Sequence, residues 1–432
     1  MDVTSDRLSA SKKTLASRWQ DFSSGVPLLG WLLGALVAVL LEQLIGTPFA
    51  RAMWLPKVPV LFGCVIMLKK PFLIPSAMAY VLLIYVLPIG AIARLSATAM
   101  NRLAAKLFET RMIVSVFVHI LLLYAILHIW SGMSEYRLLV LKLMLIAVML
   151  TLSLNVINGY MGEFSCSHPG FMALGAYASS AFTVLLFAND RLFGEALLPQ
   201  VIGPFFFPIA LFIGGLVAAV GALVVAIPSF RTRGDYLAII SLAFMFIVKS
   251  LIENLEVVGG PRGLGQQPNW ANLPVVFTTA VLCIWIINNF VRSTMGKALN
   301  AVRDNEMAAD AMTVNTRKTK MLAFLFSAFW AGVAGGLFAH VLRYVNPGTF
   351  GLQKLAEVLA MVYFGGLNSV YGSIVGACGI SLLGEALRPL ELYKWIIIPL
   401  LLILVMIFRP TGLIAFKEFD VKKLIQPKKT SS

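Results

Sequence analysis

The chain has 432 residues, of which 59% are hydrophobic and only 13% are charged, and its formal net charge is +15. Soluble domains carry about a quarter charged residues, so this composition excludes an ordinary soluble protein. Many apolar runs approach the roughly 20 residues that a helix needs to cross a hydrocarbon core, and they lack the alternation of barrel strands. We therefore predict an all-α fold, a polytopic inner-membrane helical bundle with about 10 to 11 spans, including two glycine-broken helical pairs.

The candidate spans, in chain order, are 26–45, 73–93, 112–130, 138–157, 171–188, 205–227, 236–252, 273–291, 321–342, the pair 355–366 with 374–387, and 395–408. The run 58–68 is too short to cross and is expected at the interface. Placing the polar segment 292–320 inside puts 22 Lys and Arg residues inside and 11 outside. This bias is typical of cytoplasmic loops, so both termini are expected in the cytoplasm.

Two glycine-rich breaks interrupt the apolar sequence. The first break, residues 158–171, reads NGYMGEFSCSHPGF, and the second, residues 364–376, reads FGGLNSVYGSIVG. Breaks in corresponding places of two halves point to a transport pathway, although close packing through small residues also favours glycine. The residues that we predict along the pathway are Gly159, Gly162, Glu163, Ser165, His168, Gly365, Gly366, Asn368 and Ser369.

The segment 292–320 is a polar island between two apolar runs, and its apolar residues recur at helical spacing. They are Met295, Ala298, Leu299, Val302, Ala309 and Met312. Because most are small, this stripe buries little area within its own protein, and we expect it to lie in a groove of a partner. The alternative is an ordinary solvated loop helix.

Charged residues at membrane depth are functional hypotheses, because they need partners there. Those in or near spans or breaks are Glu42, Lys142, Glu163, His168, Lys249 and Glu357. Lys142, Lys249 and Glu42 are close enough to span ends to reach the interface, and a hydrogen-bonded packing role suits His168 better than proton transfer. No Walker loop, Ser/His/Asp set or metal-ligand spacing occurs, so we expect no catalytic residue, no metal and no cofactor.

Four blocks resemble the branched-chain amino-acid ABC transporter permeases, specifically the LivM-type subunit. They are residues 155–177, residues 230–243 (FRTRGDYLAIISLA) followed by GGPRGL at 259–264, the island from 295 to 309, and FGGLNSVYG at 364–372 with FRPTGL at 408–413. The resemblance covers about residues 138–413. It implies a permease core there, with the cytoplasmic coupling loop at 292–320. Residues 1–137 form an N-terminal extension with about three spans, and 414–432 form a basic cytoplasmic tail.

The resemblance implies a transport subunit that is not itself an enzyme. Its expected partners are a second homologous permease, two cytoplasmic ATPase subunits that bind the ATP, a periplasmic solute-binding protein, the small-molecule substrate and the lipid bilayer, but no nucleic acid. The family's ATPase-contacting helix maps onto residues 295–312, and the implied coupling residues are Lys297, Arg303, Asp304, Glu306, Ala308 and Ala309. Glu306 is expected to fix the register on the partner with a charged hydrogen bond.

Two departures from the family's pattern bear on these expectations. Members often have Leu-Gly-Ile where this chain has Met312-Thr-Val314, which leaves the end of the coupling helix open. They often have Leu-Gly-His where this chain has Cys166-Ser-His168, which leaves the solute open.

The expected function is therefore ATP-driven import of branched-chain amino acids across the cell inner (plasma) membrane by a multi-pass subunit. One alternative is the same type of permease importing urea or a related small amide. An alternative of another class is a stand-alone secondary transporter or channel, which leaves the polar island without a role.

Overall fold

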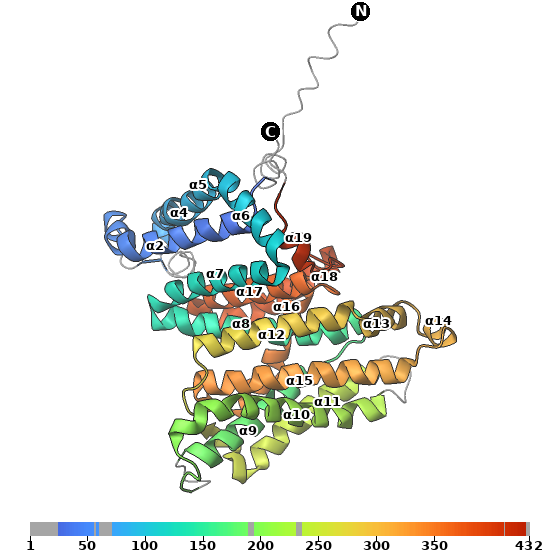
Figure 1. The fold of residues 1–432 in the computed structure, drawn as a ribbon. Helices are drawn as coiled ribbons and strands as arrows, with labels where there is room; N and C mark the ends of the chain where they lie inside the picture. The colour runs from blue at the N-terminus through green and yellow to red at the C-terminus, as the bar shows by residue number, and fades with distance from the viewer. Residues whose placement is uncertain are drawn as a thin grey trace, which may run out of the picture. The chain divides into compact units, whose positions relative to one another are not determined.

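The computed structural model describes residues 25–55, 58–59, 71–188, 194–229, 236–409 and 411–428. Helices dominate these ranges (Figure 1). Nine of the helices described are long and apolar enough to cross a membrane, and two shorter apolar helices are Val370–Ala386 and Tyr393–Phe408. The predicted all-α polytopic membrane fold is confirmed. Residues 230–235 of the second resemblance block and 60–68 of the interfacial run lie outside the described residues.

Contacts divide the chain into two compact units. Unit 1 comprises Met1–Arg137 with Asp420–Ser432, and unit 2 comprises Leu138–Phe419. The described elements of unit 1 are α2 (Leu28–Ala52), η2 (Pro71–Leu73), α4 (Ile74–Val81), the π-helical turn η3 (Leu82–Val86), α5 (Leu87–Leu95), α6 (Ala97–Thr110), α7 (Met112–Gly132) and α19 (Val421–Ile425). Helices α4 and α5 continue through η3 as one span, and α2 packs against α5 and α7.

A buried ion pair lies inside unit 1. Arg137 donates to both carboxylate oxygens of Glu42, at 2.8 and 3.0 Å, and the two side chains are 4% and 1% exposed. Tyr85 also donates to this carboxylate, through its hydroxyl. The prediction that Glu42 reaches the interface is therefore wrong, because a charge with a bidentate partner is satisfied in place.

Unit 2 is organised around long, mutually packed helices. Its centre contains α8 (Glu135–Asn155), which continues into the π-helical turn η4 (Val156–Met161), together with α9 (His168–Phe187) and α15 (Thr316–Leu342). These three spans are the most buried of those described, and α10 (Gly203–Ser229) packs against both α9 and α15 (Figure 1).

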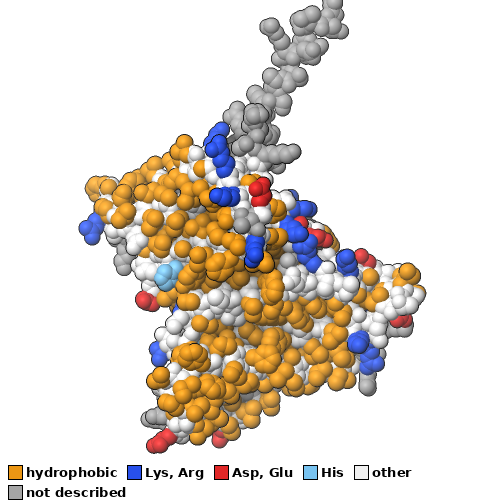
Figure 2. Space-filling model, viewed as in Figure 1, with side chains coloured by type: hydrophobic (Ala, Val, Ile, Leu, Met, Phe, Trp, Pro, Cys, Tyr) orange, Lys and Arg blue, Asp and Glu red, His pale blue; other side chains and the backbone are white. Residues whose placement is uncertain are grey.

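The remaining helices of unit 2 surround this centre. They are α11 (Tyr236–Asn254), α12 (Leu273–Arg292), α16 (Leu352–Gly365), α17 (Val370–Ala386) and α18 (Glu391–Phe408). A two-residue antiparallel pair joins β1 (Leu264–Gly265) to β2 (Tyr344–Val345). Apolar side chains cover much of the visible surface (Figure 2), and on α10 and α11 they include exposed Phe205, Val224 and Ile239. Such broad apolar faces suit contact with lipid rather than water.

Candidate coupling and transport site

The polar island folds into two short helices. Helix α13 spans Thr294–Asp304 and α14 spans Glu306–Ala311. Between them Asn305 has an extended backbone, and its side chain accepts a hydrogen bond from the Ala308 amide at 3.0 Å. An Asn at this position caps a new helix, so the single helix expected over residues 295–312 is divided at Asn305.

The apolar stripe of the island packs mainly against its own chain. Leu299, Val302 and Ala309 are at most 5% exposed. The prediction that the whole stripe faces a partner is therefore wrong, because these side chains already complete the fold of unit 2. The large apolar side chains of the island that are exposed are Met307 and Met312, at 80% and 77%. Of the implied coupling residues, Ala309 is buried, Arg303 is half-buried, and Lys297, Asp304, Glu306 and Ala308 are exposed.

One lysine binds both the island and the first break. The Lys320 ammonium, on the first turns of α15, lies 2.6 Å from Glu163 Oε1 and 2.9 Å from Glu306 Oε2. The Lys320 side chain is only 10% exposed, and charge-assisted hydrogen bonds are strongest where water is scarce. Glu306, expected to bind a partner, thus has a partner in its own chain. No role was predicted for Lys320, although it is the last basic residue before the apolar run 321–342.

Arg303 makes a second link between the island and the first break. Its Nη1 donates to the Gly159 carbonyl at 3.3 Å, and its Nη2 lies 2.8 Å from Asp304. Gly162 has a φ of +76°, and a Cβ atom there would overlap Cγ of Arg303. Only glycine allows both this backbone conformation and this approach. The island therefore lies directly on the first break.

The two breaks contact each other through Asn155, the last residue of α8. Asn155 Nδ2 donates to the Ser369 carbonyl at 3.0 Å and to Ser373 Oγ at 2.7 Å, and its Oδ1 accepts from the Asn368 amide at 3.1 Å. A Cβ atom on Gly159 would clash with Asn155 Oδ1 and would lie 2.5 Å from the Asn368 nitrogen. Asn155 was not among the predicted site residues, although it is an amide near the end of the apolar run 138–157, just before the first break.

The other predicted pathway residues lie in the same region. Gly365 and Phe364 accept backbone hydrogen bonds from Ile414 and Leu413, so the C-terminal part of unit 2 holds the second break. Ser165 lies 2.9 Å from Ser167, between the hydroxyl oxygens. His168 is fully buried and lies 3.1 Å from Ser327 Oγ. This environment fits a packing role for His168, and its place along a pathway stays a prediction.

The described residues include no group of three or more His, Cys, Asp or Glu side chains that could hold a metal ion.

A bundle of apolar spans, with a polar loop bound to the first of two contacting breaks, defines a multi-pass membrane protein of the permease class. The family model described as "Branched-chain amino acid transport system / permease component" matches residues 136–407. The chain belongs to this family.

Its relatives include two types of permease subunit. The chain is 32% identical over 315 residues to the high-affinity branched-chain amino acid transport system permease protein LivM of Escherichia coli K12, which covers 65% of this chain and 70% of that protein. It is 29% identical over 161 residues to the LivH permease protein of the same organism, which covers 34% of this chain and 52% of that protein. The autoinducer 2 import system permease protein LsrC of Klebsiella pneumoniae is 26% identical over 154 residues, 34% of this chain and 43% of that protein. No solved structure matches the chain.

Proposed function

We propose that this chain is the transmembrane subunit of an ATP-driven importer for branched-chain amino acids in the cell inner membrane. The names of the LivM and LivH relatives support the solute class. The observation that carries the coupling role is the double link of the island to the first break, through Lys320 and Arg303. The proposed partners are a second homologous permease, two cytoplasmic ATPases and a periplasmic solute-binding protein.

In this mechanism ATP binds to the partner subunits, and the island transmits their motion. The exposed residues of α13 and α14, above all Met307, form with Met312, just after α14, the surface that an ATPase contacts. Displacement of α14 moves Glu306. Because Lys320 is ion-paired with both Glu306 and Glu163, this movement is transmitted to the first break. Asn155 carries the motion to the second break, because it is hydrogen-bonded to Asn368 and Ser369. A two-state rearrangement of the breaks then switches access to the path.

The substitution Lys320→Met tests this coupling. It removes the ammonium and leaves Glu163 and Glu306 without their shared cation, so the link between island and break is lost. We expect solute import per ATP hydrolysed to fall by at least tenfold, since a charged hydrogen bond contributes about 1.5–3 kcal/mol. The measurement is uptake of radiolabelled leucine together with ATP hydrolysis, by the assembled complex in proteoliposomes.

The matched control is Lys318→Met, which removes an exposed lysine from the same turn of α15. It is expected to transport like the unmodified complex. If Lys320→Met also keeps full import per ATP, the island does not couple to the break through this ammonium, and the proposed mechanism is wrong.

The solute class is tested separately. An excess of unlabelled isoleucine or valine should block leucine uptake, and an equal excess of urea should not. Inhibition by urea alone would favour the amide-importing alternative. Uptake driven by an ion gradient without any ATPase would favour a secondary transporter.

A further inference from the structure

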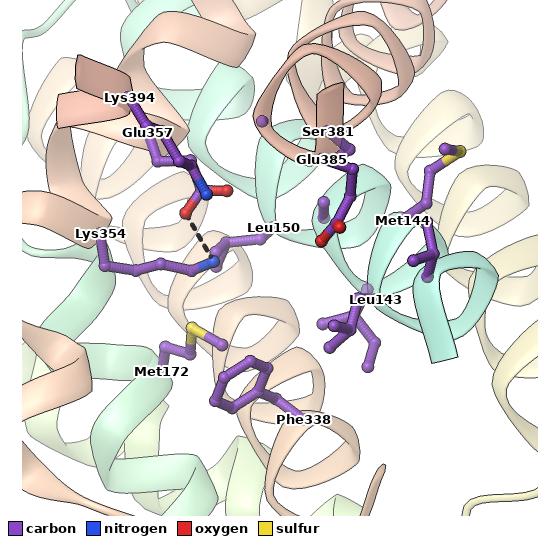
Figure 3. A pocket seen from close by; sticks show the side chains of 14 residues that line it. Leu143, Met144, Leu150, Met172, Phe338, Lys354, Glu357, Ser381, Glu385 and Lys394 are labelled. Carbon is purple, nitrogen blue, oxygen red and sulfur yellow. Dashed lines mark hydrogen bonds and ion pairs between the residues drawn. The ribbon is translucent and has the colours of Figure 1, made fainter. Parts of the chain in front are cut away.

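Unit 2 contains a partly open cavity that none of the predicted pathway residues lines. It holds about 170 Å³ and lies among α8, α9, α15, α16, α17 and α18 (Figure 3). A single water needs on the order of 10–15 Å³ of such space, so the cavity has room for roughly a dozen heavy atoms. A small amino acid is therefore of the right size.

Two cations and two anions line this cavity. Lys354 Nζ lies 3.0 Å from Glu357 Oε2 and 5.7 Å from the centre of the Phe338 ring. Lys394 approaches from α18, close enough for its charge to act on Glu357 (Figure 3). Glu385 on α17 is the second anion, and it pairs at 3.5 Å with the exposed Arg388. The formal charges of the four lining residues balance.

The rest of the wall is largely apolar. Leu143, Met144 and Leu150 come from α8, and Met172 and Phe338 face them from α9 and α15 (Figure 3). One part of the wall carries balanced charges, and another part presents aliphatic and aromatic side chains. Such a cavity suits a ligand that has charged groups of opposite sign and an apolar side chain. An anion or a cation would leave an uncompensated charge in a partly dry site, whereas a zwitterion would not. A small amide such as urea would leave the apolar wall without contacts.

The cavity lies along the helices that lead to the breaks. Glu357 precedes Gly365 by eight residues of α16, which is roughly 12 Å along a helix. Leu150 precedes Asn155 by five residues of α8, or roughly 7 Å. Because the island binds the first break, the contact between the breaks lies between this cavity and the island.

We propose that this cavity binds an α-amino acid with an aliphatic side chain, with its carboxylate toward Lys354 and Lys394 and its ammonium toward Glu357 and Glu385. The aliphatic side chain lies against Met144, Met172 and Phe338. This inference rests on the proposed function, because it assigns the solute to a place in unit 2. It concerns binding, however, and so can be tested without transport.

The test measures equilibrium binding of radiolabelled leucine to the purified permease–ATPase complex in nanodiscs, without nucleotide or solute-binding protein. Unlabelled leucine should compete fully. Isocaproate, which lacks the ammonium, and isoamylamine, which lacks the carboxylate, should compete at least tenfold more weakly, because each leaves charged groups unmatched.

Two variants test the place of binding. Glu357→Gln should raise the Kd for leucine about tenfold or more, because it removes the anion that faces the ammonium. Gly384→Leu should abolish saturable binding by filling the cavity. A Cβ atom at Gly384 meets only Lys394, at 3.4 Å, so the backbone has room for a side chain. The matched control is Glu253→Gln, which removes an acid from the partly exposed Lys249–Glu253 pair, away from the cavity, and should leave the Kd unchanged.

The proposal is overturned if leucine binds both cavity variants with the unmodified Kd, if isocaproate competes as well as leucine, or if the unmodified complex does not bind leucine. If Glu357→Gln does not assemble with the ATPases, the proposal is tested by the competition of isocaproate and isoamylamine with leucine and by leucine binding to Gly384→Leu. A failure of the proposed function looks different. In that case leucine binds the cavity, but ATP drives no uptake.

Discussion

At the scale of single residues, close backbone contact makes the first break depend on Gly159. There is no room for a side chain between Asn155 and the Asn368 amide. We predict that Gly159→Ala separates the two breaks and destabilises unit 2 by about 1–3 kcal/mol, the usual cost of forcing a group into a packed site. The measurement is the midpoint of thermal inactivation of the purified protein. Gly132→Ala, where no atom lies within 4 Å of the new Cβ, is the control and should shift it little.

Thr313 occupies the left-handed region with a φ of +68°, just after α14 ends. A β-branched residue in this region is strained. We predict that Thr313→Gly raises thermal stability by up to about 1 kcal/mol, because it removes strain at a helix C-terminus. Thr313→Ala should raise thermal stability by less than Thr313→Gly, since alanine keeps a Cβ atom. A lower melting temperature for the glycine variant would contradict the strain argument.

Burial in the first break raises the pKa of the Cys166 thiol to about 11. The cause is desolvation, which disfavours the charged thiolate, so the reactive form becomes abundant only as the pH approaches that value. We predict that a variant with Cys166 as its one cysteine resists maleimide near pH 7 and reacts faster as pH rises. Mass spectrometry of the modified protein follows the reaction. Rapid labelling at pH 7 would show that the break opens to solvent.

At the scale of helices and loops, local pattern predicted most of the structure. The spans follow from runs of apolar residues, because a helix satisfies its own backbone hydrogen bonds in lipid. The division of the island at Asn305 was missed, since the apolar spacing runs through that position. The stripe of Leu299, Val302 and Ala309 was assigned to a partner because sequence spacing identifies a face without showing what covers it.

The pair of Glu42 on α2 and Arg137 on α8 gives an element-scale prediction. Removing one member leaves a buried charge alone, so Arg137→Met should destabilise unit 1 by about 3–5 kcal/mol. The double variant Glu42→Leu with Arg137→Met should recover most of that loss, because two apolar side chains replace the whole pair. Thermal unfolding of the solubilised protein measures both. Equal losses in the single and double variants would contradict this account.

At the scale of the whole molecule, the exposed part of α14 is expected to be covered in the assembled importer. Met307 is 80% exposed in this chain. We predict that Met307→Cys, in a variant without other cysteines, reacts quickly with a charged maleimide in the chain alone and slowly once the ATPases are bound. A cysteine in place of exposed Arg262, which lies outside the spans, is the control. Equal labelling of Met307→Cys in both states would show that α14 is not the docking surface.

The links that join the parts of the site were beyond sequence reasoning. Lys320 meets Glu163 across 157 positions, and Asn155 meets Ser369 across 214. Such pairings depend on how helices pack in three dimensions, and one sequence without its fold does not record them. The segments that make these contacts could nevertheless be identified from the sequence, since both breaks and the island are polar interruptions of an apolar chain.

The shared ammonium of Lys320 has one more consequence. It satisfies two carboxylates only while both lie within about 3 Å of it. Once α14 moves away, the lysine must keep one carboxylate and release the other, so intermediate positions lose an ion pair without gaining one. The two ion pairs therefore favour the position of α14 in this structure over a displaced one.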